Sequence, residues 1–142
     1  MLALVGTPVV GDGIYKGECA AIAQFLVPGL GYSRVSQWKR GAKVKGNHSL
    51  RRGTVIAIFD SNGRYIGTSK HSHRNAAHTA LYVRQSSAGI EIVHQFKSPS
   101  LEKIKGALVR WGGQSVLGHQ SGVSVSGGTP EDDADNYHVV EL

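Results

Sequence analysis

The chain has 142 residues, the length of one domain that can bury a single core without disulfides. Sixteen Lys and Arg against ten Asp and Glu give a net charge of +6, which favours anionic partners: nucleic acid, a membrane surface or an acidic polymer such as a cell wall. The single cysteine excludes an internal disulfide, and no apolar run reaches the roughly eighteen residues of a membrane span. Residues 1–6 lack the basic region and the length of a signal peptide, so we expect a protein made in the cytoplasm without one.

The first third of the chain carries the helical pattern. A helix is predicted over residues 18–26, because its apolar positions follow the i, i+3, i+4, i+7 spacing of one face: Cys19, Ile22, Ala23 and Leu26. Pro28 and Gly29 end this helix. A second short helix is predicted over residues 33–39, with Val35 and Trp38 facing inward.

From residue 54 onward the pattern is that of β-strands. Residues 54–59 are rich in β-forming residues and lead through a turn into 64–66, which predicts a hairpin. A second and clearer hairpin is predicted over 78–84 and 90–96. The centre of the fold is therefore expected to be an antiparallel sheet.

The other segments are predicted as loops or further strands. Residues 68–77 are polar and predict an exposed loop, whereas 104–111 fit either a strand or a short helix. Residues 112–136 are dominated by Gly, Ser and acidic residues and predict a long, mobile loop before a closing strand at 137–141. We therefore expect one α+β domain over residues 1–142, in which the first helix packs on an antiparallel sheet of about five strands.

Two histidines of the clearer hairpin are predicted to share one face of the sheet. If Arg84 pairs with Ile90, His94 lies opposite Ala80, and His78 becomes its diagonal neighbour on the same face. Two imidazoles within reach of each other can serve as a base and its orienting group.

Cys19 stands where a polar turn gives way to the predicted helix. A thiol in the first turn of a helix is favoured as thiolate by the unpaired N–H groups and by the helix dipole. Packed against the start of the histidine strand, Cys19 would complete the nucleophile, base and third group of a cysteine hydrolase. From position alone, the alternative that Cys19 is a small buried hydrophobe stays open.

Three sequence blocks occur in an order known from one hydrolase family. The blocks are GECAA (17–21), GTVIAIF (53–59) and HTALYV (78–83), and SQWKRG (36–41) is similar to a Trp-and-Gly segment of close relatives. Together they resemble the NlpC-type papain-like cysteine peptidases and the related CHAP amidases, which cleave peptide bonds of bacterial peptidoglycan. The resemblance covers residue 15 to about residue 96. Among the subgroups, a small basic chain without an export signal is most similar to the amidase effectors of type VI secretion.

The resemblance implies a papain-like domain and a role for each matching residue. Cys19 would be the nucleophile and His78 the base. The third polar residue would be His94, with Gln95 on the opposite face as the alternative. Tyr15 would help the Cys19 backbone N–H stabilise the oxyanion, although an aromatic cover of the helix start fits Tyr15 equally well.

The implied reaction is amide hydrolysis through an acyl-enzyme, without a cofactor or metal. The implied substrate is the wall peptide stem or the D-alanine–diaminopimelate cross-link, met in the periplasm of a target bacterium after secretion. An immunity protein that blocks the cleft is the implied partner, and we expect a monomer. Glu18 departs from the Asp or Gln that many members place before the cysteine, and its carboxylate opposes thiolate formation unless it points away.

Two other features give weaker hypotheses. His71, His73 and His78 alternate like zinc ligands, but no convincing fourth ligand follows. A basic cluster lacks the interleaved aromatic residues of a nucleic-acid binder, so we expect no nucleic-acid partner; its members are Lys39, Arg40, Lys43, Lys45, Arg51 and Arg52. The alternative to an enzyme is a non-catalytic basic binding module for nucleic acid or cell wall.

Overall fold

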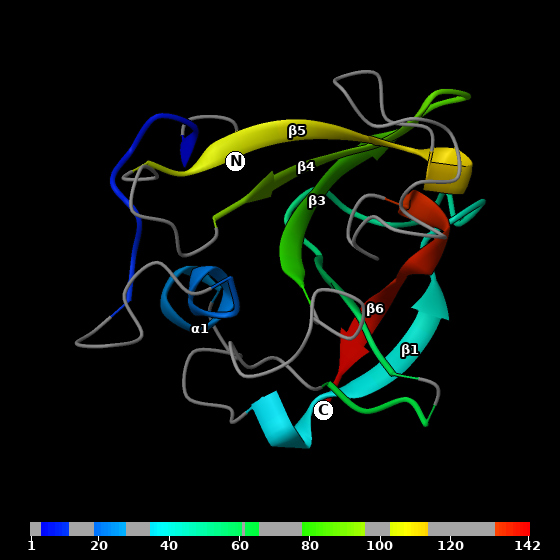
Figure 1. Cartoon of the computed structure of the whole chain (residues 1–142), viewed down its shortest axis with the longest axis horizontal. Coiled ribbons are helices and arrows are strands. Elements are labelled where there is room, and N and C mark those ends of the chain that lie inside the picture. Colours follow the sequence, from blue (N-terminus) through cyan, green and yellow to red (C-terminus); the bar gives the residue numbers. More distant parts are fainter. Residues whose placement is uncertain are drawn as a thin grey trace.

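A six-stranded antiparallel sheet organises the chain (Figure 1). The computed structural model describes residues 4–11, 19–27, 35–60, 62–65, 78–95, 103–113 and 133–142. The strands are β1 (Lys39–Lys43), β2 (Val55–Ile58), β3 (Thr79–Gln85), β4 (Gly89–His94), β5 (Lys105–Arg110) and β6 (Tyr137–Glu141). Their order in the sheet is β1-β6-β2-β3-β4-β5, and each neighbouring pair is antiparallel.

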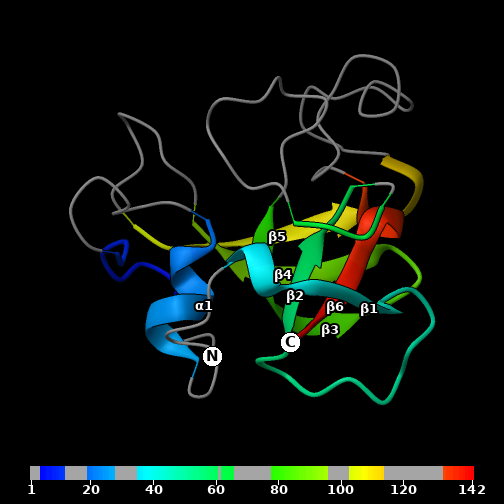
Figure 2. The same ribbon diagram turned by 90° about the horizontal axis from the view of Figure 1, so that it is seen from below.

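Both faces of the sheet are covered, so β2, one of its two central strands, is apolar throughout. All four residues of β2 are buried, and side chains alternate between the two faces. One face packs against the helix α1 (Ala21–Leu26), whose Ile22 joins Leu81 and Val93 in the core. The second face buries Tyr82 and Tyr137. Both views place α1 beside the strands (Figures 1 and 2).

The clearer predicted hairpin is confirmed as β3 and β4, but its register near the turn differs from the prediction. Arg84 pairs with Glu91 instead of Ile90. A β-bulge between Tyr82 and Arg84 then changes the register, so that Tyr82 pairs with Ile92. Beyond the bulge the strands therefore follow the predicted register, in which the two histidines share a face.

The prediction of a second helix over 33–39 is wrong in the part that the structure describes. Only a 3₁₀ turn forms there, over Val35–Gln37, and β1 begins at Lys39. Trp38 is buried and Val35 is partly buried against the same core, as predicted. The chain becomes extended because β1 pairs with β6, which makes the sheet six-stranded instead of about five-stranded.

The first predicted hairpin is also wrong, although its turn forms. The Asp60 carboxylate accepts hydrogen bonds from the N–H groups of Asn62 and Arg64, at 2.9 and 2.8 Å. Arg64 then makes an isolated bridge with Lys39 of β1 and does not extend β2. Both edges of β2 are already paired, with β3 and with β6, so no edge remains for the returning segment.

The remaining predictions have mixed outcomes. The segment 104–111 is a strand, β5, and the closing strand β6 lies between β1 and β2. The ends of the predicted loop 112–136 meet where the Gly112 N–H donates to Asp135 at 3.3 Å. Residues 114–132 of that loop and all of the predicted loop 68–77 lie outside the described residues. No helix in the described segments is long and apolar enough to cross a membrane.

Gly89, at the start of β4, provides a test of this packing. A Cβ atom there would lie 2.0 Å from the Val109 carbonyl oxygen of β5, and its φ of +156° disfavours a side chain. We expect Gly89→Ala to lower the free energy of unfolding by about 2 kcal/mol or more, measured by urea denaturation.

Gly106→Ala on β5 is the matched control. Among the described residues, its Cβ would meet the Val5 side chain, at 3.4 Å, and the Ile92 carbonyl oxygen, at 3.8 Å. We expect its free energy of unfolding to change by less than about 1 kcal/mol. Equal losses in the two variants would contradict the packing described for Gly89.

Candidate active site

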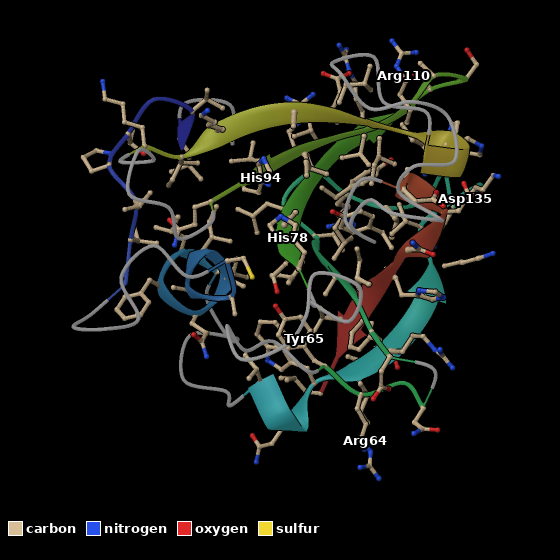
Figure 3. The ribbon with its side chains drawn as sticks, viewed as in Figure 1. Arg64, Tyr65, His78, His94, Arg110 and Asp135 are labelled. Atoms are coloured by element: carbon tan, nitrogen blue, oxygen red, sulfur yellow. The ribbon has the colours of Figure 1, made fainter. Side chains whose placement is uncertain are left out.

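The two histidines of the β3–β4 hairpin are in direct contact, as their predicted common face requires. His78 immediately precedes β3, and His94 is the last residue of β4. His78 Nε2 lies 2.8 Å from His94 Nδ1, and the rings meet edge to face with centroids 5.0 Å apart. Figure 3 shows the two imidazoles side by side, with Tyr65 beyond His78 in this view. His78 is buried, so this contact is shielded from solvent.

His94 is held in its neutral form. Burial, followed by the positive charges of His78 and Lys105, lowers its pKa from 6.5 to about 3. A neutral imidazole has one N–H donor and one acceptor nitrogen. When His78 carries a proton on both nitrogens, His94 Nδ1 is therefore the acceptor for the His78 Nε2–H.

Cys19 lies in the turn before α1 and not within the helix, which corrects the predicted helix over 18–26. The helix begins at Ala21, and the Cys19 carbonyl accepts the Ile22 N–H at 3.3 Å. The N-cap, Ala20, has no side chain that could cap the helix. Because α1 has only six residues, its dipole contributes less to thiolate stability than the sequence pattern suggested.

Tyr65 contacts the thiol, and sequence reasoning did not identify it. Its hydroxyl lies 3.4 Å from Cys19 Sγ and accepts a hydrogen bond from Thr79 Oγ1 at 2.7 Å. Thr79 is the residue after His78, so Tyr65 links the cysteine to the start of the histidine strand. Burial, followed by the charge of Cys19, raises the pKa of Tyr65 well above 10, so the phenol stays protonated.

Gln95 is the predicted alternative to His94 as the third polar residue, and Tyr15 is the predicted oxyanion residue. The fully buried Gln95 amide bonds the backbone of Val10 at both ends: Oε1 accepts the Val10 N–H at 2.8 Å, and Nε2 donates to the Val10 carbonyl at 2.9 Å. These bonds fasten the N-terminal segment to the end of β4 and favour a structural role for Gln95. Tyr15 and Glu18 lie outside the described residues, as do His71 and His73.

The predicted basic cluster is exposed and lies away from the histidines. Its members on β1 are separated from β3 by β6 and β2. Lys45 pairs with Asp135 at 3.2 Å and lies over the ring of Trp111. Within the described segments, no three side chains of His, Cys, Asp or Glu gather as a metal site.

Comparison with known proteins gives three matches. The family model of domesticated amidase effector 2 matches residues 2–125. A type VI secretion amidase effector 2 protein of Salmonella typhi is 41% identical over 95 residues, which are 67% of this chain and 62% of that relative's length. The solved structure of a type 6 secretion amidase effector 2 superposes with a TM-score of 0.71 at 28% identity, over 99% of this chain and 89% of that one.

His94 predicts a specific dependence of stability on pH. Its pKa is about 3 in the fold against 6.5 in the unfolded chain, so below pH 6.5 the unfolded chain binds a proton that the folded protein does not. The stability that neutral His94 gives the fold is therefore fully present above pH 6.5 and is lost as the pH falls toward 3. From pH 7 to pH 5 we expect the free energy of unfolding, measured by urea denaturation, to fall by about 2 kcal/mol more for the wild type than for His94→Asn.

The control is His48→Asn, which removes an exposed histidine. We expect its free energy of unfolding to change with pH as that of the wild type does. If the free energies of unfolding of the wild type and His94→Asn changed equally with pH, His94 would not be neutral in the fold.

Proposed function

Because the chain belongs to the domesticated amidase effector 2 family, we propose that it is a cysteine amidase that hydrolyses a peptide bond of peptidoglycan through an acyl-enzyme. The observation that carries this proposal is the contact between His78, just before β3, and His94, at the end of β4, where Tyr65 and Thr79 connect β3 to Cys19. The packing of α1 on β3 supports it, because the turn that bears Cys19 leads directly into α1. A papain-like arrangement of helix and sheet is part of the proposal.

The reaction begins with proton transfer from Cys19 to His78. His78 Nε2 is engaged with His94, so we assign Nδ1 of His78 as the atom that exchanges the proton. The thiolate attacks the carbonyl carbon, forms the C–S bond and places negative charge on the carbonyl oxygen. Collapse of this intermediate breaks the C–N bond, and His78 gives its proton to the leaving amine. His78 then takes a proton from water, whose oxygen attacks the thioester and releases Cys19 as thiolate.

His94 orients the base without carrying a charge. A hydrogen bond from protonated His78 to the neutral His94 fixes the imidazole ring in one orientation. A carboxylate in this place would also stabilise the imidazolium by charge attraction. The neutral acceptor therefore supplies mainly orientation.

The names of the relatives support the proposed substrate and route. Both are named as type VI secretion amidase effectors, and the chain spans about 62% of the length of the Salmonella typhi protein. We propose the wall peptide stem or the D-alanine–diaminopimelate cross-link as substrate and the periplasm of a target bacterium as the place of action. A cognate immunity protein that blocks the site is the proposed partner. The net charge of +6 suits an anionic wall polymer.

Digestion of purified peptidoglycan sacculi, with mass analysis of the products, tests this function and identifies the bond. We expect Cys19→Ala and His78→Asn each to lower the rate of fragment release by roughly 10³-fold or more. His138→Asn, a strand histidine on β6, is the matched control and should retain the wild-type rate. Full activity of Cys19→Ala would exclude the cysteine mechanism, whereas no fragment release by the wild type would favour the non-catalytic basic binding module.

A pair of substitutions tests the orienting role of His94. His94→Asn keeps an acceptor oxygen, so we expect kcat to fall less than about 10-fold, whereas His94→Ala removes the acceptor and lowers kcat by roughly 10- to 100-fold. KM should change little in both variants, because the lost interaction acts on the base and not on the substrate. Equal kcat values for the two variants would contradict this role.

A further inference from the structure

A buried tyrosine touches the sulfur of the proposed nucleophile. We propose that Tyr65 is a second catalytic group, whose phenol donates a hydrogen bond to Cys19 Sγ and stabilises the thiolate. Thr79 is the positioning residue that fixes the direction of this bond. The inference rests on the proposed function, because it takes Cys19 as the nucleophile.

The hydrogen-bond directions favour Tyr65 as the donor. The Thr79 hydroxyl donates to Tyr65 Oη at 2.7 Å and so occupies an acceptor site of the phenol oxygen. The single phenolic proton then remains available for Cys19 Sγ at 3.4 Å, a normal distance for a bond to sulfur. A thiolate has no proton to donate, so in that state of Cys19 only Tyr65 can be the donor.

The phenol is held in place before the reaction. The Tyr65 ring packs against Trp38 at a centroid distance of 5.1 Å and edge-on against Phe59 at 6.1 Å. Tyr65 is 5% exposed and Thr79 fully buried, so water does not compete for these hydroxyls. A fixed donor in such a site stabilises an anion more than a donor in water, because it needs no reorganisation.

Tyr65 also remains a donor over the pH range in which the thiol ionises. Its pKa is raised well above 10 by burial and by the charge of Cys19, so Tyr65 keeps its proton when Cys19 loses its own. The six-residue helix that follows Cys19 provides only a weak dipole. Tyr65 supplies stabilisation that the helix lacks.

Residues at the start of β3 supply or orient both members of the proposed ion pair, the His78 imidazolium and the Cys19 thiolate. His78 presents the base, and the next residue, Thr79, directs Tyr65 toward the sulfur. His78 immediately precedes β3 and Thr79 is the first residue of β3, so the two residues reach different partners from adjacent positions. The imidazolium and the thiolate are thus each oriented by a neutral group.

The test is Tyr65→Phe, which removes the hydroxyl and keeps the ring. We expect the apparent pKa of Cys19, measured as the pH dependence of iodoacetamide alkylation, to rise by about one unit, a 10-fold smaller thiolate fraction at pH values below that pKa. The acid limb of fragment release should shift in the same direction. Tyr82→Phe is the matched control, because it removes a buried hydroxyl from the other face of β3, and we expect no shift.

Thr79 provides a second pair of variants that does not depend on the stability of Tyr65→Phe. Thr79→Val removes the positioning hydroxyl, so we expect a smaller shift in the same direction, and Thr79→Ser should restore the wild-type profile. A purely structural role of Thr79 would change stability without this recovery of the alkylation profile.

Alkylation needs no peptidoglycan, so the two proposals can fail separately. An unchanged alkylation profile in folded Tyr65→Phe overturns the role of Tyr65, even if the wild type releases wall fragments. A shifted profile in a protein that releases no fragments supports the hydrogen bond and overturns only the proposed substrate.

Discussion

The 2.8 Å hydrogen bond between His78 and His94 is the contact on which the proposed chemistry depends, and the register of β3 and β4 produces it. A shift of one residue along the whole hairpin would turn one imidazole to the other face of the sheet. The bulge between Tyr82 and Arg84 confines the altered pairing to the end near the turn. The cores on both faces hold this register, because any slip would move apolar side chains of β3 and β4 out of their layers.

The features that local pattern determines were predictable from the sequence. Alternation over 78–84 and 90–96 specifies a hairpin, and the two-residue period places both histidines on one face even though the pairing assumed for Arg84 is wrong. The inward direction of Trp38 and the closing strand β6 were likewise predictable from short stretches of sequence. The family resemblance, carried by blocks around Cys19 and His78, agrees with the family match over residues 2–125.

Features that depend on distant partners were not predictable. β1 is a strand because it pairs with β6, almost a hundred residues along the chain, and its own sequence of mostly basic residues has no strand pattern. The sequence around Tyr65 predicts a returning strand, yet the Tyr65 hydroxyl contacts Cys19 and Thr79, which lie far from it in the sequence. The start of α1 after Cys19 is a boundary error of the kind that pattern reading makes most often.

Two side chains that contact the proposed catalytic pair, those of His94 and Tyr65, are uncharged. His94 stays neutral because burial and nearby positive charges lower its pKa to about 3, and Tyr65 stays neutral because burial and Cys19 raise its pKa. Neither group exchanges a proton with the pair at neutral pH, so in the proposed mechanism the proton that leaves Cys19 stays on His78 until it passes to the leaving amine. The hydrogen-bond geometry that β3 imposes through these two residues therefore contributes to the stability of the proposed ion pair.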